Sequence, residues 1–279
     1  MSYRSVLVPM GDETETRLRL STAIALAKRF DSHVTALFVA PSPTMVVSDG
    51  FVGAYMPSDV IEAQRRAYAE QAEKTRKLVD DMLGGAGISH DWLSLEGDPG
   101  RLVTTQARAC DLVILSKPRR PDLDDWFASG SVERVILNAG VPALVVPVSK
   151  TVDAFGARVL LGWNGSRECR RALTEGLPLM HLADQVGLLA IDADDQDGEL
   201  PTAHLMVDRL RQRGIKAEAV LVASEGLPVE EVILSQVNEY VADSLILGAY
   251  SHSRLRELVL GGVSRRMLSD PPVPVLLAY

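Results

Sequence analysis

One stretch near the C-terminus reads Leu245-Ile-Leu-Gly248-Ala-Tyr-Ser251, continues as His-Ser-Arg-Leu-Arg-Glu-Leu-Val-Leu, and reaches Gly261-Gly262-Val-Ser264. An apolar run ends at a glycine, a polar segment follows, and a glycine pair opens a second amphipathic segment. This order predicts a buried strand, a loop of exposed backbone amides and a helix N-terminus. Backbone N–H groups converge at such a place and attract anions, phosphates above all. Taken alone, the glycines could simply turn the chain, so the surrounding sequence must decide.

The same pattern occurs once more in the chain. Asp111-Leu-Val-Ile-Leu115 matches Asp243-Ser-Leu-Ile-Leu247, and from there the two copies align without a gap at an offset of 132 residues (243 − 111). The offset places Gly130 on Gly262. A repeat of this length indicates an internal duplication. We therefore predict a first domain over residues 1–149 and a second over residues 154–279.

Each half alternates short apolar runs with amphipathic segments. Expected strands cover residues 5–9, 34–40, 90–95, 111–115, 143–146, 158–162, 186–191, 217–222, 243–247 and 273–277. The expected helices include a long charged one over residues 59–83, capped by Ser58 or Asp59, and one over residues 167–182 that Pro178 could break. Residues 41–58 are irregular and predict a long surface loop or lid. Such alternation is typical of parallel βαβ units in a doubly wound α/β sheet, which binds ligands at the carboxyl ends of its strands.

Composition narrows the class of protein. The 279 residues suit two domains, and 47% apolar with 24% charged residues is typical of a globular protein. The formal charge of −8 argues against a general nucleic-acid binder. Cys110 and Cys169 match no zinc or redox spacing. We see no signal peptide and no apolar run long enough to cross a membrane, so we expect a cytoplasmic protein without membrane contacts.

With these features the chain resembles a tandem member of the universal stress protein family over nearly its whole length. The resemblance rests on the strand ends Val8-Pro9 and Gly162-Trp-Asn-Gly-Ser166, the turns Gly97-Asp-Pro99 and Gly226-Leu-Pro228, the glycine-rich loop and the closing Val-Pro strands. It implies two tandem, Rossmann-like domains, each with a five-stranded parallel sheet, and a role in stress response. Because the family pairs domains through the last strand, residues 141–146 should lie against residues 273–278 as an internal pseudo-dimer. A homodimer of chains is also expected.

Nucleotide-binding members of the family have a G-x2-G-x9-G-[S/T] loop. Here Gly248-x2-Ser251-x9-Gly261-Gly262 keeps the spacing, but Ser251 replaces the second glycine and Gly262 the Ser/Thr. Serine brings a hydroxyl donor, Gly262 retains its N–H, and Ser264 offers another hydroxyl. The resemblance therefore implies ATP or another adenine nucleotide as ligand, with or without Mg²⁺.

Other site positions follow from the resemblance one by one. The aspartate that the family places after the first strand is Asn164 here, which can still donate and accept. Trp163 could stack on a base or fill the core. The complete expected set of ligand-binding residues is Gly162, Trp163, Asn164, Ile191, Leu247, Gly248, Ala249, Tyr250, Ser251, Gly261, Gly262, Val263 and Ser264.

The first half departs from this loop. Ser116 stands at the first glycine position, and Lys117-Pro-Arg-Arg-Pro121 replaces the turn, so two prolines remove N–H donors. Gly11 or Asp12 falls near the family's aspartate, and only Gly130-Ser131 is intact. Two interpretations stay open: a degenerate domain kept for packing, which we favour, or a basic loop that holds a phosphate.

The sequence carries no strong catalytic signature. His252 lies in the glycine-rich loop, but the other histidines have no metal spacing, and no P-loop lysine occurs. Whether the protein is an enzyme is left open, with slow ATP hydrolysis as the most that these residues suggest. The alternative function is a nucleotide-free, dimeric scaffold of the stress response that acts through protein partners.

Overall fold

The computed structural model describes residues 2–42, 57–117, 131–149, 152, 154–192, 202–249 and 262–279. Among these, no helix is long and apolar enough to cross a membrane. The predicted lid over residues 41–58 falls almost entirely outside the described residues. All ten predicted strands are present, so the apolar runs did identify the sheet.

The first half contains five strands and four helices in its described parts. In chain order they are β1 (Ser5–Pro9), α1 (Glu13–Phe30), β2 (His33–Ala40), α2 (Ser58–Val79) with the π-helical turn η1 (Asp80–Gly84), β3 (His90–Glu96), α3 (Pro99–Ala107), β4 (Leu112–Leu115), α4 (Ser131–Asn138) and β5 (Ala143–Val145).

The second half repeats this order in its described parts. Its elements are β6 (Arg158–Gly162), α5 (Arg167–His181), β7 (Gln185–Ile191), α6 (Ala203–Arg211), β8 (Ala217–Val222), α7 (Val229–Glu239), β9 (Ser244–Gly248), α8 (Gly262–Ser269) and β10 (Val275–Ala278).

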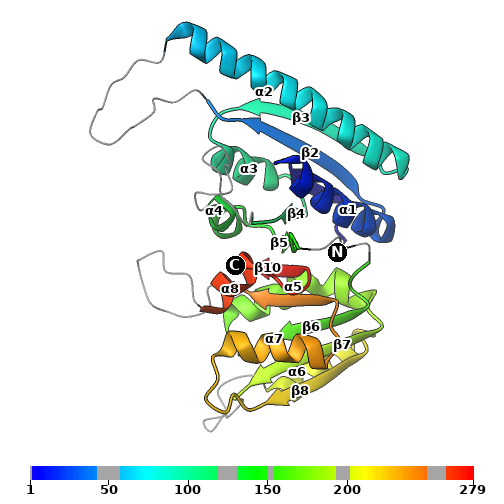
Figure 1. Cartoon of the computed structure of the whole chain (residues 1–279). Helices are drawn as coiled ribbons and strands as arrows, with labels where there is room; N and C mark the ends of the chain where they lie inside the picture. The colour runs from blue at the N-terminus through cyan, green and yellow to red at the C-terminus, as the bar shows by residue number, and fades with distance from the viewer. Residues whose placement is uncertain are drawn as a thin grey trace, which may run out of the picture.

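All ten strands form one sheet, in the order β3-β2-β1-β4-β5-β10-β9-β6-β7-β8 (Figure 1). Strands within a half are parallel, and the two halves meet where β5 and β10 pair antiparallel. Leu144 stands opposite Leu276, and Val145 opposite Val275. The predicted pairing of residues 141–146 with residues 273–278, and hence the internal pseudo-dimer, is confirmed.

Helices cover both faces of this sheet. Alternate strand residues point to opposite faces, so Val6 and Val8 join the core under α1, α5 and α6, whereas Leu7 joins the core under α3, α4, α7 and α8. Each core crosses from one half to the other: the first contains Leu144 and Leu276, and the second contains Val145, Val275 and Leu277. The two halves therefore bury their apolar surface together.

Hydrogen bonds also join the two halves near the β5–β10 contact, which we call the seam. The Tyr3 hydroxyl donates to the Glu175 carbonyl oxygen at 2.6 Å, and Arg171 Nη2 donates to the Gly140 carbonyl oxygen at 3.1 Å. Burial, with the charge of Glu175 as a smaller cause, raises the pKa of Tyr3. The Arg29 guanidinium donates to backbone carbonyl oxygens of Phe155, Gly156 and Leu182.

Two helix predictions need correction. The N-cap of α2 is Pro57 and not Ser58 or Asp59, and no side chain caps this helix; the fixed φ of proline suits a chain entering a helix. Helix α5 is not broken, because it continues through Pro178. Leu173, Leu179 and Met180 of the same helix are buried in the core, and this packing outweighs the lost backbone hydrogen bond.

The seam between the halves can be tested by removing one side chain. Leu144 is 1% exposed and faces Leu276, so Leu144→Ala should lower the free energy of unfolding by about 2–5 kcal/mol. Urea denaturation measures this quantity. Leu205→Ala removes the same atoms from a side chain that is 46% exposed, and should cost less than about 0.5 kcal/mol. Equal effects in the two variants would contradict a buried seam.

Candidate functional site

The predicted site residues of the second half gather at one edge of the sheet. Strands β9, β6 and β7 are neighbours and parallel, so their carboxyl ends at Gly248, Gly162 and Ile191 lie at the same edge. Gly262, Val263 and Ser264 form the first turn of α8. Tyr250, Ser251 and Gly261 lie outside the described residues, so their predicted roles stay predictions.

After β6 the chain makes a turn that its own side chains hold. Asn164 Oδ1 accepts from the Ser166 N–H at 3.1 Å and from Cys169 Sγ at 2.9 Å. Ser166 Oγ in turn accepts from the Cys169 N–H at 3.2 Å and caps α5. The side-chain oxygen of Asn164 therefore accepts its hydrogen bonds from within the turn.

Trp163 lies in the core beside this turn. Trp163 is 6% exposed and belongs to the apolar cluster under α5 and α6. Its backbone N–H donates to the Leu189 carbonyl oxygen at 2.8 Å. This position favours the packing interpretation of Trp163 over stacking on a base.

Gly248 is held between β9 and the start of α5. A Cβ added to it would lie 2.6 Å from the Cys169 nitrogen and 2.6 Å from the Glu168 carbonyl carbon. Both are backbone atoms, which cannot move without shifting the helix. Ala249, the next residue, is fully buried and donates its N–H to the Ala278 carbonyl oxygen at 2.8 Å. The glycine that ends β9 is therefore required by close packing as well as suited to a ligand.

A charged pair opens α5 beside Gly248. Arg167 Nε lies 2.5 Å from Glu168 Oε1. Burial of Glu168 favours the neutral acid, but the hydrogen bond and charge of Arg167 outweigh it and hold the pKa of Glu168 below its ordinary value. Glu168 is thus ionised at neutral pH and its charge is already compensated.

A carboxylate that the sequence did not reveal lies at the start of α8. Glu230 is the second residue of α7, and a Cβ added to Gly262 would lie 2.8 Å from its Oε1 and 3.1 Å from its Oε2. Ser264, in the first turn of α8, is 6% exposed. No spacing in the sequence could have indicated this contact, because the two residues are brought together only by the packing of α7 on α8.

The equivalent edge of the first half has different chemistry. Ser116 is fully buried, and its hydroxyl has no hydrogen-bond partner among the residues that the structure describes. Lys117 Nζ lies 2.7 Å from Glu133 Oε1, and Glu133 belongs to the first turn of α4. Arg119, Arg120 and Gly130 lie outside the described residues. Lys117, a predicted phosphate ligand in one of the two interpretations, is therefore already paired with a carboxylate.

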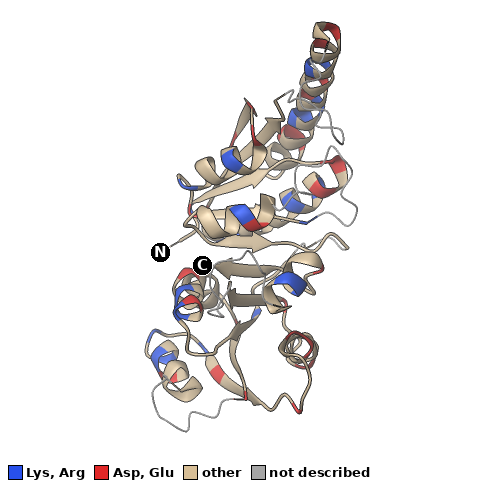
Figure 2. Ribbon diagram, turned by 90° about the vertical axis from the view of Figure 1, so that its left-hand side faces the viewer, with Lys and Arg blue, Asp and Glu red and all other residues tan. Residues whose placement is uncertain are grey.

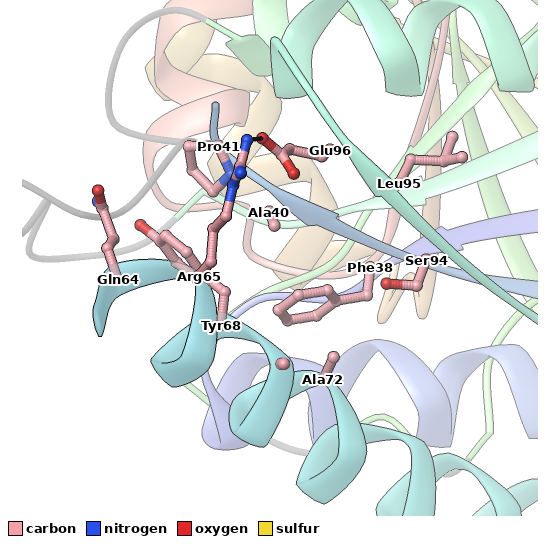
Figure 3. Close-up of a pocket in the computed structure, with 11 residues that line it drawn as sticks. Phe38, Ala40, Pro41, Gln64, Arg65, Tyr68, Ala72, Ser94, Leu95 and Glu96 are labelled. Carbon is pink, nitrogen blue, oxygen red and sulfur yellow. Dashed lines mark hydrogen bonds and ion pairs between the residues drawn. The ribbon is translucent and has the colours of Figure 1, made fainter. Parts of the chain in front are cut away.

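A separate cavity of about 270 Å³ lies between α2 and the ends of β2 and β3 (Figure 3). Phe38 and Tyr68 contribute aromatic walls, and Arg65 Nη2 lies 3.2 Å from Glu96 Oε1 at its side. Sequence patterns did not predict it, because its walls come from elements that only the fold brings together.

Close packing at Gly248 gives a stability prediction. Gly248→Ala should lower the free energy of unfolding by about 1–3 kcal/mol, because the added methyl group meets backbone atoms. Gly85→Ala is the matched control: Gly85 has an ordinary helical φ of −62°, and a Cβ added to it would meet no other atom within 4 Å among the described residues. That variant should be neutral or stabilising by up to ~1 kcal/mol. Thermal denaturation of both variants checks the difference, and a neutral Gly248→Ala would show that α5 does not fix this position.

Comparison with known proteins agrees with the geometry. The model of the universal stress protein family matches residues 2–147 and 157–278. A universal stress protein of Synechocystis sp. is 29% identical over 176 residues, covering 60% of this chain and 57% of that protein. One of Methanocaldococcus jannaschii is 26% identical over 156 residues, covering 53% of this chain and 84% of that protein.

A solved structure extends the likeness to the whole chain. A universal stress protein from Archaeoglobus fulgidus has the same fold with a TM-score of 0.72 and 17% identity, covering 100% of this chain and 99% of that one. The likeness therefore extends over both halves of the chain. The chain therefore belongs to the universal stress protein family.

Proposed function

We propose that this protein binds one adenine nucleotide, ATP with or without Mg²⁺, at the edge of the second half, as part of a stress response. The observation that carries the proposal is the difference between two equivalent edges in one chain. In the second half Gly248 ends its strand and Gly262 begins α8 at the family's spacing. In the first half Ser116 takes the place of Gly248, and Lys117, the next residue, pairs with Glu133 in the first turn of α4. Gly130, the counterpart of Gly262, lies outside the described residues.

The residues of the second half fit such a ligand. Ile191 ends β7, and Leu247 and Ala249 flank Gly248 at the end of β9. Because β7 and β9 lie on either side of β6 and are parallel to it, these residues supply an apolar side for the base and ribose at the same edge of the sheet. The first turn of α8 supplies N–H groups and the Ser264 hydroxyl for the phosphates. Asn164 offers its amide near the ribose. Tyr250, Ser251 and Gly261 complete the set that the sequence predicts.

We propose no ligand for the first half. The carboxylate of Glu133 stands in the first turn of α4, where a phosphate would be received, and Lys117 neutralises it. The domains of this proposal are residues 1–149, with a degenerate loop, and residues 154–279, with the functional loop. Lys, Arg, Asp and Glu are interspersed on the helices (Figure 2), which supports the absence of a nucleic-acid partner. A cytoplasmic location fits the two free cysteines.

The alternative is a nucleotide-free scaffold that acts as a homodimer through protein partners. The observation that favours it is the Glu230 carboxylate beside Gly262, which stands near the expected phosphates. Nucleotide released from the purified protein by acid precipitation would argue strongly against this alternative.

Calorimetry tests the proposed site directly. The protein should bind ATP in the presence of Mg²⁺ at nucleotide concentrations below ~1 mM. Ser264→Val should weaken binding roughly 10- to 100-fold, because one hydrogen bond to a charged group is lost. The fold should tolerate this change, since α4 carries the buried Val132 at the equivalent position.

Ser131→Val is the matched control in the first half. Ser131 opens α4 and is also nearly buried, so its hydroxyl should be irrelevant to ATP binding. Equal losses in the two variants would contradict a site confined to the second half. No binding at millimolar ATP, together with an unchanged melting temperature, would overturn the proposed function.

A further inference from the structure

A serine, a histidine and an aspartate lie in a row across two neighbouring strands of the first half. Strands β2 and β3 form the outer end of the sheet, away from the seam (Figure 1). In their register Thr35 stands opposite Asp91, so His33, two residues earlier, stands beside Ser89. Residues two apart on a strand point to the same face of the sheet. The three polar side chains therefore share one face, with His33 between the other two.

The two ring nitrogens of His33 bond to these two neighbours. Nδ1 lies 2.8 Å from Ser89 Oγ, and Nε2 lies 3.1 Å from Asp91 Oδ2. A carboxylate only accepts hydrogen bonds, so in the neutral ring it is Nε2 that carries the proton and donates it to Asp91. Nδ1 then keeps its lone pair, which accepts the Ser89 hydroxyl proton. Asp91 thus selects the tautomer in which His33 acts as a base toward Ser89.

The second half shows that the fold does not require this arrangement. Its equivalent positions, which follow from the register of β7 with β8, hold an amide, a lysine and a carboxylate: Gln185, Lys216 and Glu218. Gln185 Nε2 donates to Glu218 Oε1, so the link to the carboxylate is kept. An amide is not a base in neutral water, and a lysine stands where the first half has a hydroxyl. Packing of the duplicated sheet therefore explains the carboxylate but neither the base nor the nucleophile.

A cavity of about 330 Å³ opens beside this group, and both His33 and Ser89 line it. Small apolar side chains and one ion pair contribute further walls: Ala27, Ile88, and Arg4 with Asp31. Ser89 is exposed and the His33 side chain is 39% exposed, so a small molecule can reach both. A carbonyl compound that enters the cavity meets the serine hydroxyl with a base already bonded to it.

We propose that Ser89 is a catalytic nucleophile toward small carboxylic esters, with His33 as its general base and Asp91 as the residue that positions His33. A nucleophile bonded to a base, which is itself oriented by a third group, is the arrangement that activates a serine. The site lies at the amino ends of β2 and β3 and does not depend on the proposed nucleotide site.

The reaction has two steps. Ser89 Oγ forms a bond to the ester's carbonyl carbon, and the hydroxyl proton passes to His33 Nδ1. The carbon–oxygen bond to the alcohol breaks, and the alcohol leaves with that proton. Water then attacks the acyl-serine in the same way, with His33 again taking and returning the proton. The carboxylic acid is released and the Ser89 hydroxyl is restored.

Labelling with diisopropyl fluorophosphate tests the nucleophile. A bond forms between the serine oxygen and phosphorus, fluoride leaves, and the hydroxyl proton goes to the base. Peptide mapping by mass spectrometry gives the rate at which each serine is labelled. Ser94 is the internal reference, because it is also an exposed serine of this strand and bonds to no histidine within the described residues.

In the natural chain Ser89 should be labelled at least ~10-fold faster than Ser94, because a positioned base assists it. His33→Gln should remove this advantage. His90→Gln is the matched control: His90 follows Ser89 in the chain, but its Nε2 lies 3.2 Å from Asp80. This variant should be labelled like the natural chain. Melting temperatures of all variants confirm that each is folded.

Two substitutions at Asp91 test its positioning role. Asp91→Ala should slow the labelling of Ser89 by a smaller factor than His33→Gln does, because the ring loses its fixed orientation but remains a base. Asp91→Glu keeps a carboxylate and should recover part of the rate.

Hydrolysis of p-nitrophenyl acetate tests the ester substrate. The natural chain should release nitrophenolate faster than Ser89→Ala does, and an acetyl group should be found on Ser89 when the reaction is stopped early.

Each contrary result overturns a stated part of the proposal. Equal labelling of Ser89 and Ser94 in the natural chain would show that the three residues make structural hydrogen bonds only. An unchanged advantage in His33→Gln would overturn the role of the base, and an unchanged rate in Asp91→Ala that of the positioning residue. Equal release of nitrophenolate by the natural chain and Ser89→Ala would overturn esters as the substrate class.

Discussion

The antiparallel pairing of β5 with β10 is the interaction on which the rest of the structure depends. Only three residue pairs form this ladder, yet it joins two five-stranded sheets into one. Leu144 and Leu276 bury their side chains on one face of the seam, and Val145 and Val275 on the other. The edges of β5 and β10 are therefore paired with each other in the middle of the sheet and are not exposed. Each apolar core continues from one half into the other. A duplicated chain can thus satisfy internally what separate domains would satisfy by dimerising.

Because of this arrangement, the residues at the carboxyl ends of the strands can differ between the two halves while the fold stays the same. The sheet depends on buried apolar strands, which are present in both halves, whereas ligand chemistry depends on the turns that follow β4 and β9. In the first half Ser116 and Lys117 follow β4, and Lys117 pairs with Glu133 of α4. In the second half Gly248 ends β9 and lies against the backbone of α5. One half can therefore serve as a structural partner while the other keeps the site.

The sequence predicted the strands because each strand is a short apolar run and the duplication repeats them, whereas the pairing of the two halves through their last strands was implied by the family resemblance. It predicted the positions at the strand ends for the same reason. It could not predict that α5 continues through Pro178, because core packing decides this. It also could not predict that Pro57 rather than Ser58 precedes α2, because that helix starts without a side-chain cap at an exposed proline of fixed φ. It also missed Glu230, since the contact with Gly262 arises from the packing of two helices.

The central claim is that a duplicated chain retains one nucleotide site and not two. Native mass spectrometry of the intact protein, titrated with ATP and Mg²⁺, counts the nucleotides bound to each chain. The account predicts that one ATP binds per chain and that binding saturates there. Saturation at two nucleotides per chain would contradict the claim, and so would a chain that stays free of nucleotide throughout the titration.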